Sequence, residues 1–65
     1  MISGIVSDFD AAAGLGVVVA DEGGQFPFHC VEIADGTRTI AVGTAVTFGL
    51  LHKLGRLEAA RLSPR

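Results

Sequence analysis

Apolar and polar residues alternate along five short segments of this chain, and this period of two is typical of β-strands with one buried face. The segments predicted as strands are residues 2–9, 15–20, 25–29, 45–51 and 56–62. In the third segment the alternation puts Phe26 and Phe28 on one face and Pro27 on the other. In the last segment it places Ala60 and Leu62 on a common face.

Turn-forming residues separate these segments. The run Asp21-Glu22-Gly23-Gly24 predicts a tight turn, and Lys53-Leu54-Gly55 turns the chain into its last strand. Residues 10–14 fall far short of the roughly 12 that an isolated helix needs, so we predict a loop there. Residues 30–33 fit one helical turn. Five short strands and almost no helix predict a small β-barrel, because closure removes the edges that so small an open sheet could not cover.

The composition narrows the class of protein. A chain of 65 residues forms one domain, and its hydrophobic content of 49% is too high for a disordered chain. So short a domain has little room for a deep pocket, and we expect no catalytic residue, no cofactor and no small-molecule substrate. No apolar run approaches the roughly 20 residues that cross a bilayer, and the start lacks a secretory pattern, so we expect no membrane association. The lone cysteine, Cys30, cannot form an internal disulfide, which fits the cytoplasm.

Charge is divided unevenly along the chain. All five basic residues lie after position 37 and six of the seven acidic ones lie before it, so residues 1–37 carry −6 and residues 38–65 carry +4. A face built from the first part would therefore repel polyanions.

A set of residues spread over the whole chain carries a family resemblance. The set is Met1-Ile-Ser-Gly4-Ile-Val6, Phe9, Gly14-Leu-Gly16, Phe28-His29, Ile33, Asp35-Gly36, Thr39, Gly43, Val46, Phe48 and Glu58-Ala59-Ala60. With it the sequence resembles a bacterial cold-shock protein. The resemblance implies a single domain over residues 1–65 with a five-stranded antiparallel OB-type barrel. It also implies a core made of Val6, Val18, Phe26, Phe28, Ile33, Val46, Phe48 and Leu50.

The resemblance further implies binding of single-stranded RNA or DNA, which cold-shock domains achieve by stacking bases on outward aromatics fringed with lysine. This chain departs from that pattern. The positions of the outward aromatics hold Asp8, Leu15, Val17, Pro27, Cys30 and Thr37, and lysine positions hold Ile5, Ser7 and Ala13. Each lost stack removes roughly 1–3 kcal/mol, so about five of them exceed the roughly 8 kcal/mol of a micromolar complex. The fold is kept while the binding face is rebuilt.

The rebuilt face is predicted to be a protein interface. Its residues are Ile5, Asp8, Leu15, Val17, Pro27, His29 and Cys30. Neighbouring strands would set these side chains beside each other as one apolar, acid-rimmed patch, and such patches mark partner surfaces. We therefore interpret the chain as a regulatory module that binds a protein partner or pairs with itself as a dimer. Scattered surface apolar residues, which are normal in soluble proteins, are the plainer interpretation.

The residues also bear on two other functions. Weak binding of single-stranded nucleic acid would use Phe9, His29, Arg38, Lys53 and Arg56. A metal site would need three or four converging ligands, whereas the adjacent His29 and Cys30 project to opposite sides of a strand. We therefore expect no metal, and the same geometry argues against a His–Cys nucleophile. Cys30 is expected to be a half-buried hydrophobic residue.

Overall fold

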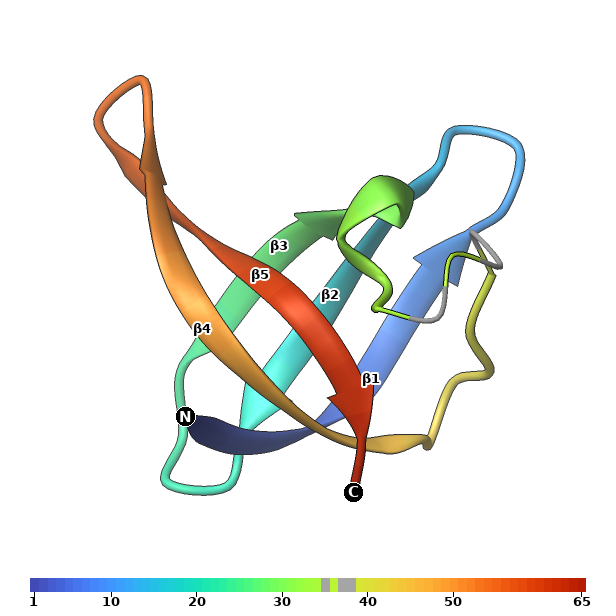
Figure 1. Cartoon of the computed structure of the whole chain (residues 1–65), viewed down its shortest axis with the longest axis horizontal. Helices are drawn as coiled ribbons and strands as arrows, with labels where there is room; N and C mark the ends of the chain where they lie inside the picture. Colours follow the sequence, from blue (N-terminus) through green and yellow to red (C-terminus); the bar gives the residue numbers. More distant parts are fainter. Residues whose placement is uncertain (35, 37–38) are drawn as a thin grey trace.

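The computed structural model describes residues 1–34, 36 and 39–65. This part of the chain forms one antiparallel sheet of five strands in the order β3-β2-β1-β4-β5 (Figure 1). The strands are β1 (Ile2–Asp10), β2 (Leu15–Ala20), β3 (Gln25–His29), β4 (Ala45–Lys53) and β5 (Arg56–Pro64). A single 3-10 turn, η1 (Cys30–Glu32), follows β3. The predicted all-β class, the five strands and the helical turn are confirmed, and three strands run one or two residues longer than predicted.

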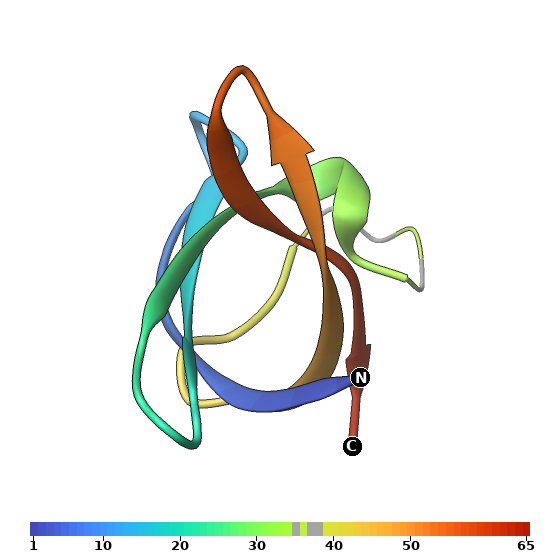
Figure 2. The same cartoon turned by 90° about the vertical axis from the view of Figure 1, so that its left-hand side faces the viewer.

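The sheet curls on itself, so that its two edge strands, β3 and β5, pack against each other (Figure 2). Within the described residues these edges are not joined by a hydrogen-bonded ladder, so the closure predicted from the pattern is not achieved through the backbone. Pro27 gives a physical reason. The amides of Ala20 and Cys30 donate to the carbonyls of Gly24 and Gly14. Backbone amides point alternately to the two sides of a strand, so the amide of Cys30 faces β2 and the nitrogen of Pro27 faces the open edge of the sheet. Proline has no hydrogen to donate there.

Two β-bulges decide which side chains face the interior. In β1 the register against β2 shifts between Val6 and Asp8, so that Phe9 turns inward. In β5 the bulge lies between Ala60 and Ser63, which pair with Gly49 and Thr47 of β4, so that β5 has one residue more than β4 over this stretch. Arg61 lies in the bulge and has a φ of 56°. The Arg61 amide donates instead to a carboxylate oxygen of Glu32 at 3.2 Å.

The second bulge corrects the predicted face of the last strand. Because it adds one residue to β5, Ala59 and Leu62 both face the core although they are three positions apart. Ala60, which strict alternation paired with Leu62, is only half-buried.

The core lies inside the curl of the sheet. Its members are Val6, Val18, Ala20, Phe28, Ile33, Val46, Phe48, Ala59 and Leu62. Most of the predicted core is confirmed, and Phe26 packs against this cluster from a half-buried position. The prediction for Leu50 is wrong, because the β4–β5 hairpin extends past the rest of the sheet and leaves this side chain 41% exposed (Figure 1).

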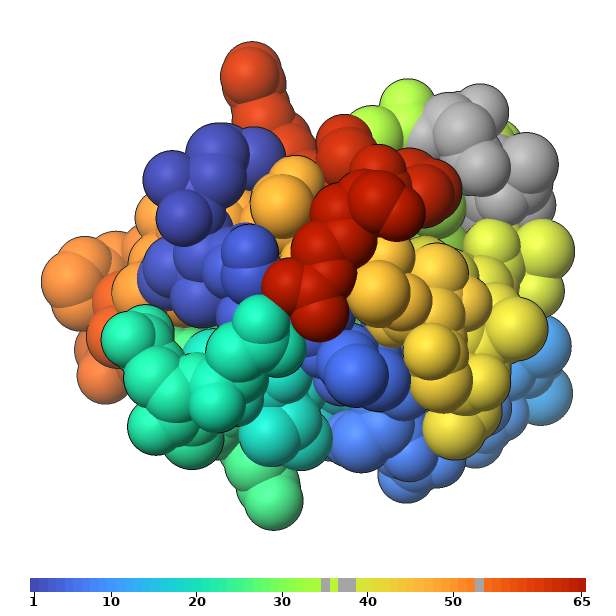
Figure 3. All heavy atoms as spheres, turned by 90° about the horizontal axis from the view of Figure 1, so that it is seen from below, coloured from blue at the N-terminus to red at the C-terminus, as the bar shows by residue number. Residues whose placement is uncertain are grey.

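Local contacts fix the connections between strands. The Asp10 carboxylate accepts hydrogen bonds from the amides of Ala12 and Ala13 at 3.0 and 3.2 Å, which confirms the predicted loop. At the other end of the molecule the last residues of β5 cross beside the start of β1 and the β2–β3 turn (Figure 3). There Arg65 donates to the Asp21 carboxylate at 2.8 Å. None of the helices in the described ranges has the length and apolar character needed to cross a membrane.

Candidate functional site

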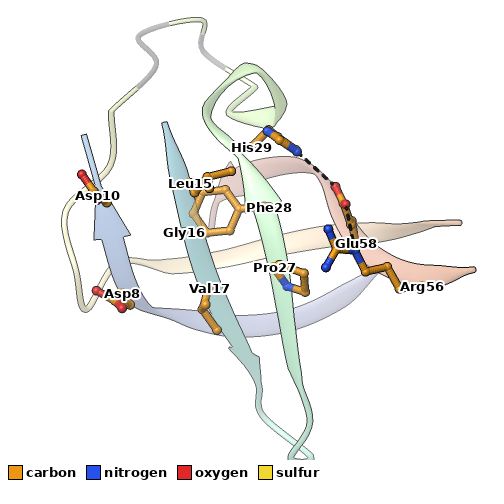
Figure 4. A pocket seen from close by; sticks show the side chains of 10 residues that line it. All are labelled: Asp8, Asp10, Leu15, Gly16, Val17, Pro27, Phe28, His29, Arg56 and Glu58. Carbon is orange, nitrogen blue, oxygen red and sulfur yellow. Dashed lines mark ion pairs between the residues drawn. The ribbon is translucent and has the colours of Figure 1, made fainter. Parts of the chain in front are cut away.

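A hollow of about 410 Å³ opens on the outer face of β1, β2 and β3, with β5 as its wall (Figure 4). The lining residues are Asp8, Asp10, Leu15, Gly16, Val17, Pro27, Phe28, His29, Arg56 and Glu58. This is the face on which the sequence predicted a partner surface.

The register of the sheet builds the hollow from two cross-strand rows. Residues directly opposite in an antiparallel pair project their side chains on the same face, about 4.5–5.5 Å apart. The rows are Asp8–Val17–Pro27 and Asp10–Leu15–His29. Each row therefore runs from a carboxylate on β1, across an aliphatic residue on β2, to a ring on β3.

A third row lies between these two. Its side chains point to the inner face of the sheet, and it forms the floor of the hollow. It runs from Phe9 through Gly16 to Phe28. Because Gly16 has no side chain, the Phe28 ring packs beneath it, and the rings of Phe9 and Phe28 stack at a centroid distance of 6.0 Å and an angle of 10°. The aromatic rings of this region are thus part of the structure under the hollow.

The bulge in β1 sets the charge of the rim. Strict alternation from the buried Gly4 and Val6 would turn Asp8 and Asp10 into the core and expose Phe9. The extra residue reverses this, so that both carboxylates point outward and Phe9 packs against the core. Asp10 was not predicted from the sequence, because a bulge has no reliable local signature.

The opposite wall is a side-chain bridge between the two edge strands. Nε2 of His29 on β3 lies 3.8 Å from one oxygen of the Glu58 carboxylate, and Nε of Arg56 lies 3.8 Å from the other (Figure 4). Glu58 is only 5% exposed, and the Arg56 guanidinium beside it offsets part of the cost of burying its charge. Sequence reasoning missed this role of Glu58, because β3 and β5 become neighbours only when the sheet curls.

The structure brings most of the predicted interface together. Asp8, Leu15, Val17, Pro27 and His29 all line the hollow, with Leu15 47% exposed and Val17 half-buried.

Two predicted members lie elsewhere. Ile5 is exposed but outside the lining, in the next outward row of the sheet beside Val19. Cys30 is half-buried against the core, which confirms its expected packing, whereas His29 is exposed.

The residues predicted for nucleic-acid binding are divided. His29 and Arg56 line the hollow, while Phe9 is stacked on Phe28. Thr37, Arg38 and the side chain of Lys53 lie outside the described residues. Among the side chains that the structure describes, no three from His, Cys, Asp and Glu gather closely enough to hold a metal ion.

No protein-family model matches the chain, and no curated protein sequence matches it significantly. Membership of the cold-shock family stays a prediction from the sequence, and the function is argued below from the hollow itself.

Proposed function

We propose that this chain is a non-enzymatic protein-interaction module with a regulatory role, which binds its partner in the hollow on β1, β2 and β3. The supporting observation is the pair of cross-strand rows, which gathers the aliphatic side chains of Leu15, Val17 and Pro27 between the two rim carboxylates and the wall in which Glu58 is paired with its basic neighbours. These three side chains are not part of the core cluster, which lies on the other side of the sheet.

The energy available from this surface is moderate. Full burial of a valine or leucine side chain contributes roughly 1.5–3 kcal/mol. About half of that remains for Leu15, which is 47% exposed, and a smaller share for Val17, which is already largely covered. Pro27 adds a rigid contact that loses little conformational entropy on binding. The rim carboxylates of Asp8 and Asp10 favour a partner with basic groups.

Weak binding of single-stranded nucleic acid is the second candidate. The observation in its favour is that His29 and Arg56 both line the hollow. Two observations weigh against it. The Phe9 and Phe28 rings are packed on each other below the hollow, and the nearby carboxylates repel phosphates.

The deciding experiment changes the hollow without touching the core. Leu15→Lys with Val17→Lys places two charges in the aliphatic centre, and Val31→Lys with Val42→Lys is the matched control at exposed positions outside it. Each protein serves as bait in a nuclease-treated pull-down, after thermal melts have shown that all three fold. We expect a protein partner to be retained by the wild type and the control and lost by the hollow variant.

Two outcomes contradict this function. Equal retention by the hollow variant would place the interface elsewhere. Submicromolar binding of a labelled oligo-dT by the wild type, measured by fluorescence anisotropy at roughly physiological salt, would establish the second candidate instead.

A further inference from the structure

The two rows that cross the hollow are spaced like alternate residues of an extended chain. They begin at Asp8 and Asp10 and are two residues apart on each of β1, β2 and β3. At the rise of about 3.4 Å per residue in antiparallel strands, the rows lie about 7 Å apart. Side chains i and i+2 of an extended peptide point to one side and have the same spacing. One such peptide, lying along the strands, would therefore place a side chain in each row.

Charge differs between the two ends of each row. At the β1 end Asp8 and Asp10 are exposed, and among the side chains that the structure describes neither carboxylate has a basic partner (Figure 4). At the other end Arg56 already faces Glu58, so this wall has little net charge, and its guanidinium repels a second cation. A positively charged group in the hollow is therefore drawn to the β1 end.

The middle of each row suits an aliphatic chain. Val17 and Leu15 lie directly opposite Asp8 and Asp10, and side chains paired in this way are about 4.5–5.5 Å apart. Lysine and arginine have aliphatic stems that pack on apolar surface while the charged head stays in a polar environment. A basic side chain that enters over β2 thus covers Leu15 or Val17 with its stem and places its head beside a rim carboxylate.

We propose that the hollow binds an extended segment of another protein in which two basic residues, lysine or arginine, are separated by one residue. This inference rests on the proposed function and names the chemistry of the partner for the same site. The middle residue of the segment points away from the hollow, so its side chain is not selected. No two of the five basic residues in this chain are two positions apart, so a second copy does not provide such a segment.

The first test uses two peptides of one composition with blocked ends, Ser-Arg-Val-Arg-Ser and Ser-Arg-Arg-Val-Ser. Both carry two positive charges, but only the first directs both arginines to one side of an extended backbone. Dissociation constants are measured by NMR titration of the nitrogen-15-labelled protein, and the shifted amides are expected in β1, β2 and β3. We expect the second peptide to bind about tenfold more weakly, because it loses one stem contact and one ion pair.

The second test removes the charge of the rim. Asp8→Asn with Asp10→Asn keeps the shape of both side chains, and the amide oxygen at position 10 still accepts hydrogen bonds from the loop after β1. We expect the dissociation constant of the first peptide to rise about tenfold, about threefold for each exposed ion pair. The matched control, Asp21→Asn with Glu22→Gln, removes two charges from the β2–β3 turn outside the lining. It should change the constant by less than about twofold at roughly physiological salt.

A charge exchange tests for direct contact in one row. Asp8→Lys repels an arginine placed there, whereas a glutamate in that place pairs with the introduced ammonium. The peptides Ser-Glu-Val-Arg-Ser and Ser-Arg-Val-Glu-Ser offer the glutamate to either row. We expect at least one of them to bind Asp8→Lys about tenfold more tightly than it binds the wild type, because a repulsion is replaced by an ion pair. If neither gains, the proposal is overturned.

Further outcomes overturn this inference and leave the proposed function intact. One is equal binding of the two arginine peptides by the wild type. Another is a natural partner in the pull-down that is lost by Leu15→Lys with Val17→Lys but retained by Asp8→Asn with Asp10→Asn. Self-association of the wild type that Leu15→Lys with Val17→Lys abolishes would assign the hollow to a second copy instead. A partner retained by both variants would contradict the proposed function as well, and loss by both is the expected result.

Discussion

Replacing Gly16 by alanine tests the placement of Phe28 beneath the hollow. A Cβ built on Gly16 would lie 2.4 Å from Cζ of Phe28 and 2.9 Å from the carbonyl oxygen of Asp8. Both separations are shorter than real Cβ contacts, and neither neighbour yields easily. The Phe28 ring is fully buried and stacked on Phe9, and the carbonyl belongs to the backbone of β1.

The expected loss follows from this overlap. Forcing an extra methyl group into a packed core costs roughly 1–3 kcal/mol, occasionally more. The entire stability of a 65-residue domain is roughly 3–10 kcal/mol, from about 0.05–0.15 kcal/mol per residue. Gly16→Ala is therefore expected to lower the melting temperature by roughly 4–24 °C, at about 4–8 °C for each kcal/mol.

Gly49→Ala is the matched control. Gly49 also lies within a strand, but a Cβ there meets no atom within 4 Å and its φ is outside the left-handed region. The alanine reduces the conformational freedom of the unfolded chain, so we expect an unchanged stability or a gain of about 0.4–1 kcal/mol. The same substitution should thus destabilise the protein at Gly16 and not at Gly49.

The assays are thermal unfolding for the melting temperature and urea unfolding for the free energy, both followed by far-ultraviolet circular dichroism, because the chain has no tryptophan or tyrosine to report by fluorescence. If Gly16→Ala does not fold, the double variant with Phe28→Leu should recover folding by removing the ring that collides. Equal stabilities of Gly16→Ala and Gly49→Ala would refute the reasoning, since they would mean that the Phe28 ring does not lie under Gly16.

Two further predictions concern single side chains. Phe28→Ala should cost about 3–5 kcal/mol, because the ring is buried, whereas His29→Ala should cost about 1 kcal/mol or less, since Arg56 remains beside Glu58. Equal losses in thermal melts would contradict the faces assigned to β3. Asp21→Asn should cost about 1 kcal/mol or less by weakening the exposed pair with Arg65. That loss should shrink in melts at about 1 M salt, and a salt-independent loss would argue against an ionic contact.

The sequence alone was sufficient for the strands and most of the core. Alternation with a period of two located all five strands, and glycine-containing turns located their ends, because both depend on neighbours along the chain. Val18 and Phe28 were assigned to the core through the resemblance to cold-shock proteins, and the structure buries both. The outward faces of β2 and β3 followed from the same alternation, and with them Leu15, Val17, Pro27 and His29 of the hollow.

Tertiary structure decided everything that depends on what lies opposite a residue. The bulge in β1 turned Asp10 outward and Phe9 inward, and the bulge in β5 buried Ala59. A bulge is set by the register against a neighbouring strand, which periodicity along one strand does not contain. Leu50 lies on the core-facing side of β4, but the hairpin at that point extends past the core, so the side chain is exposed. Glu58 became part of the site only because the curl of the sheet brings β5 to β3, and burial is a property of that packing.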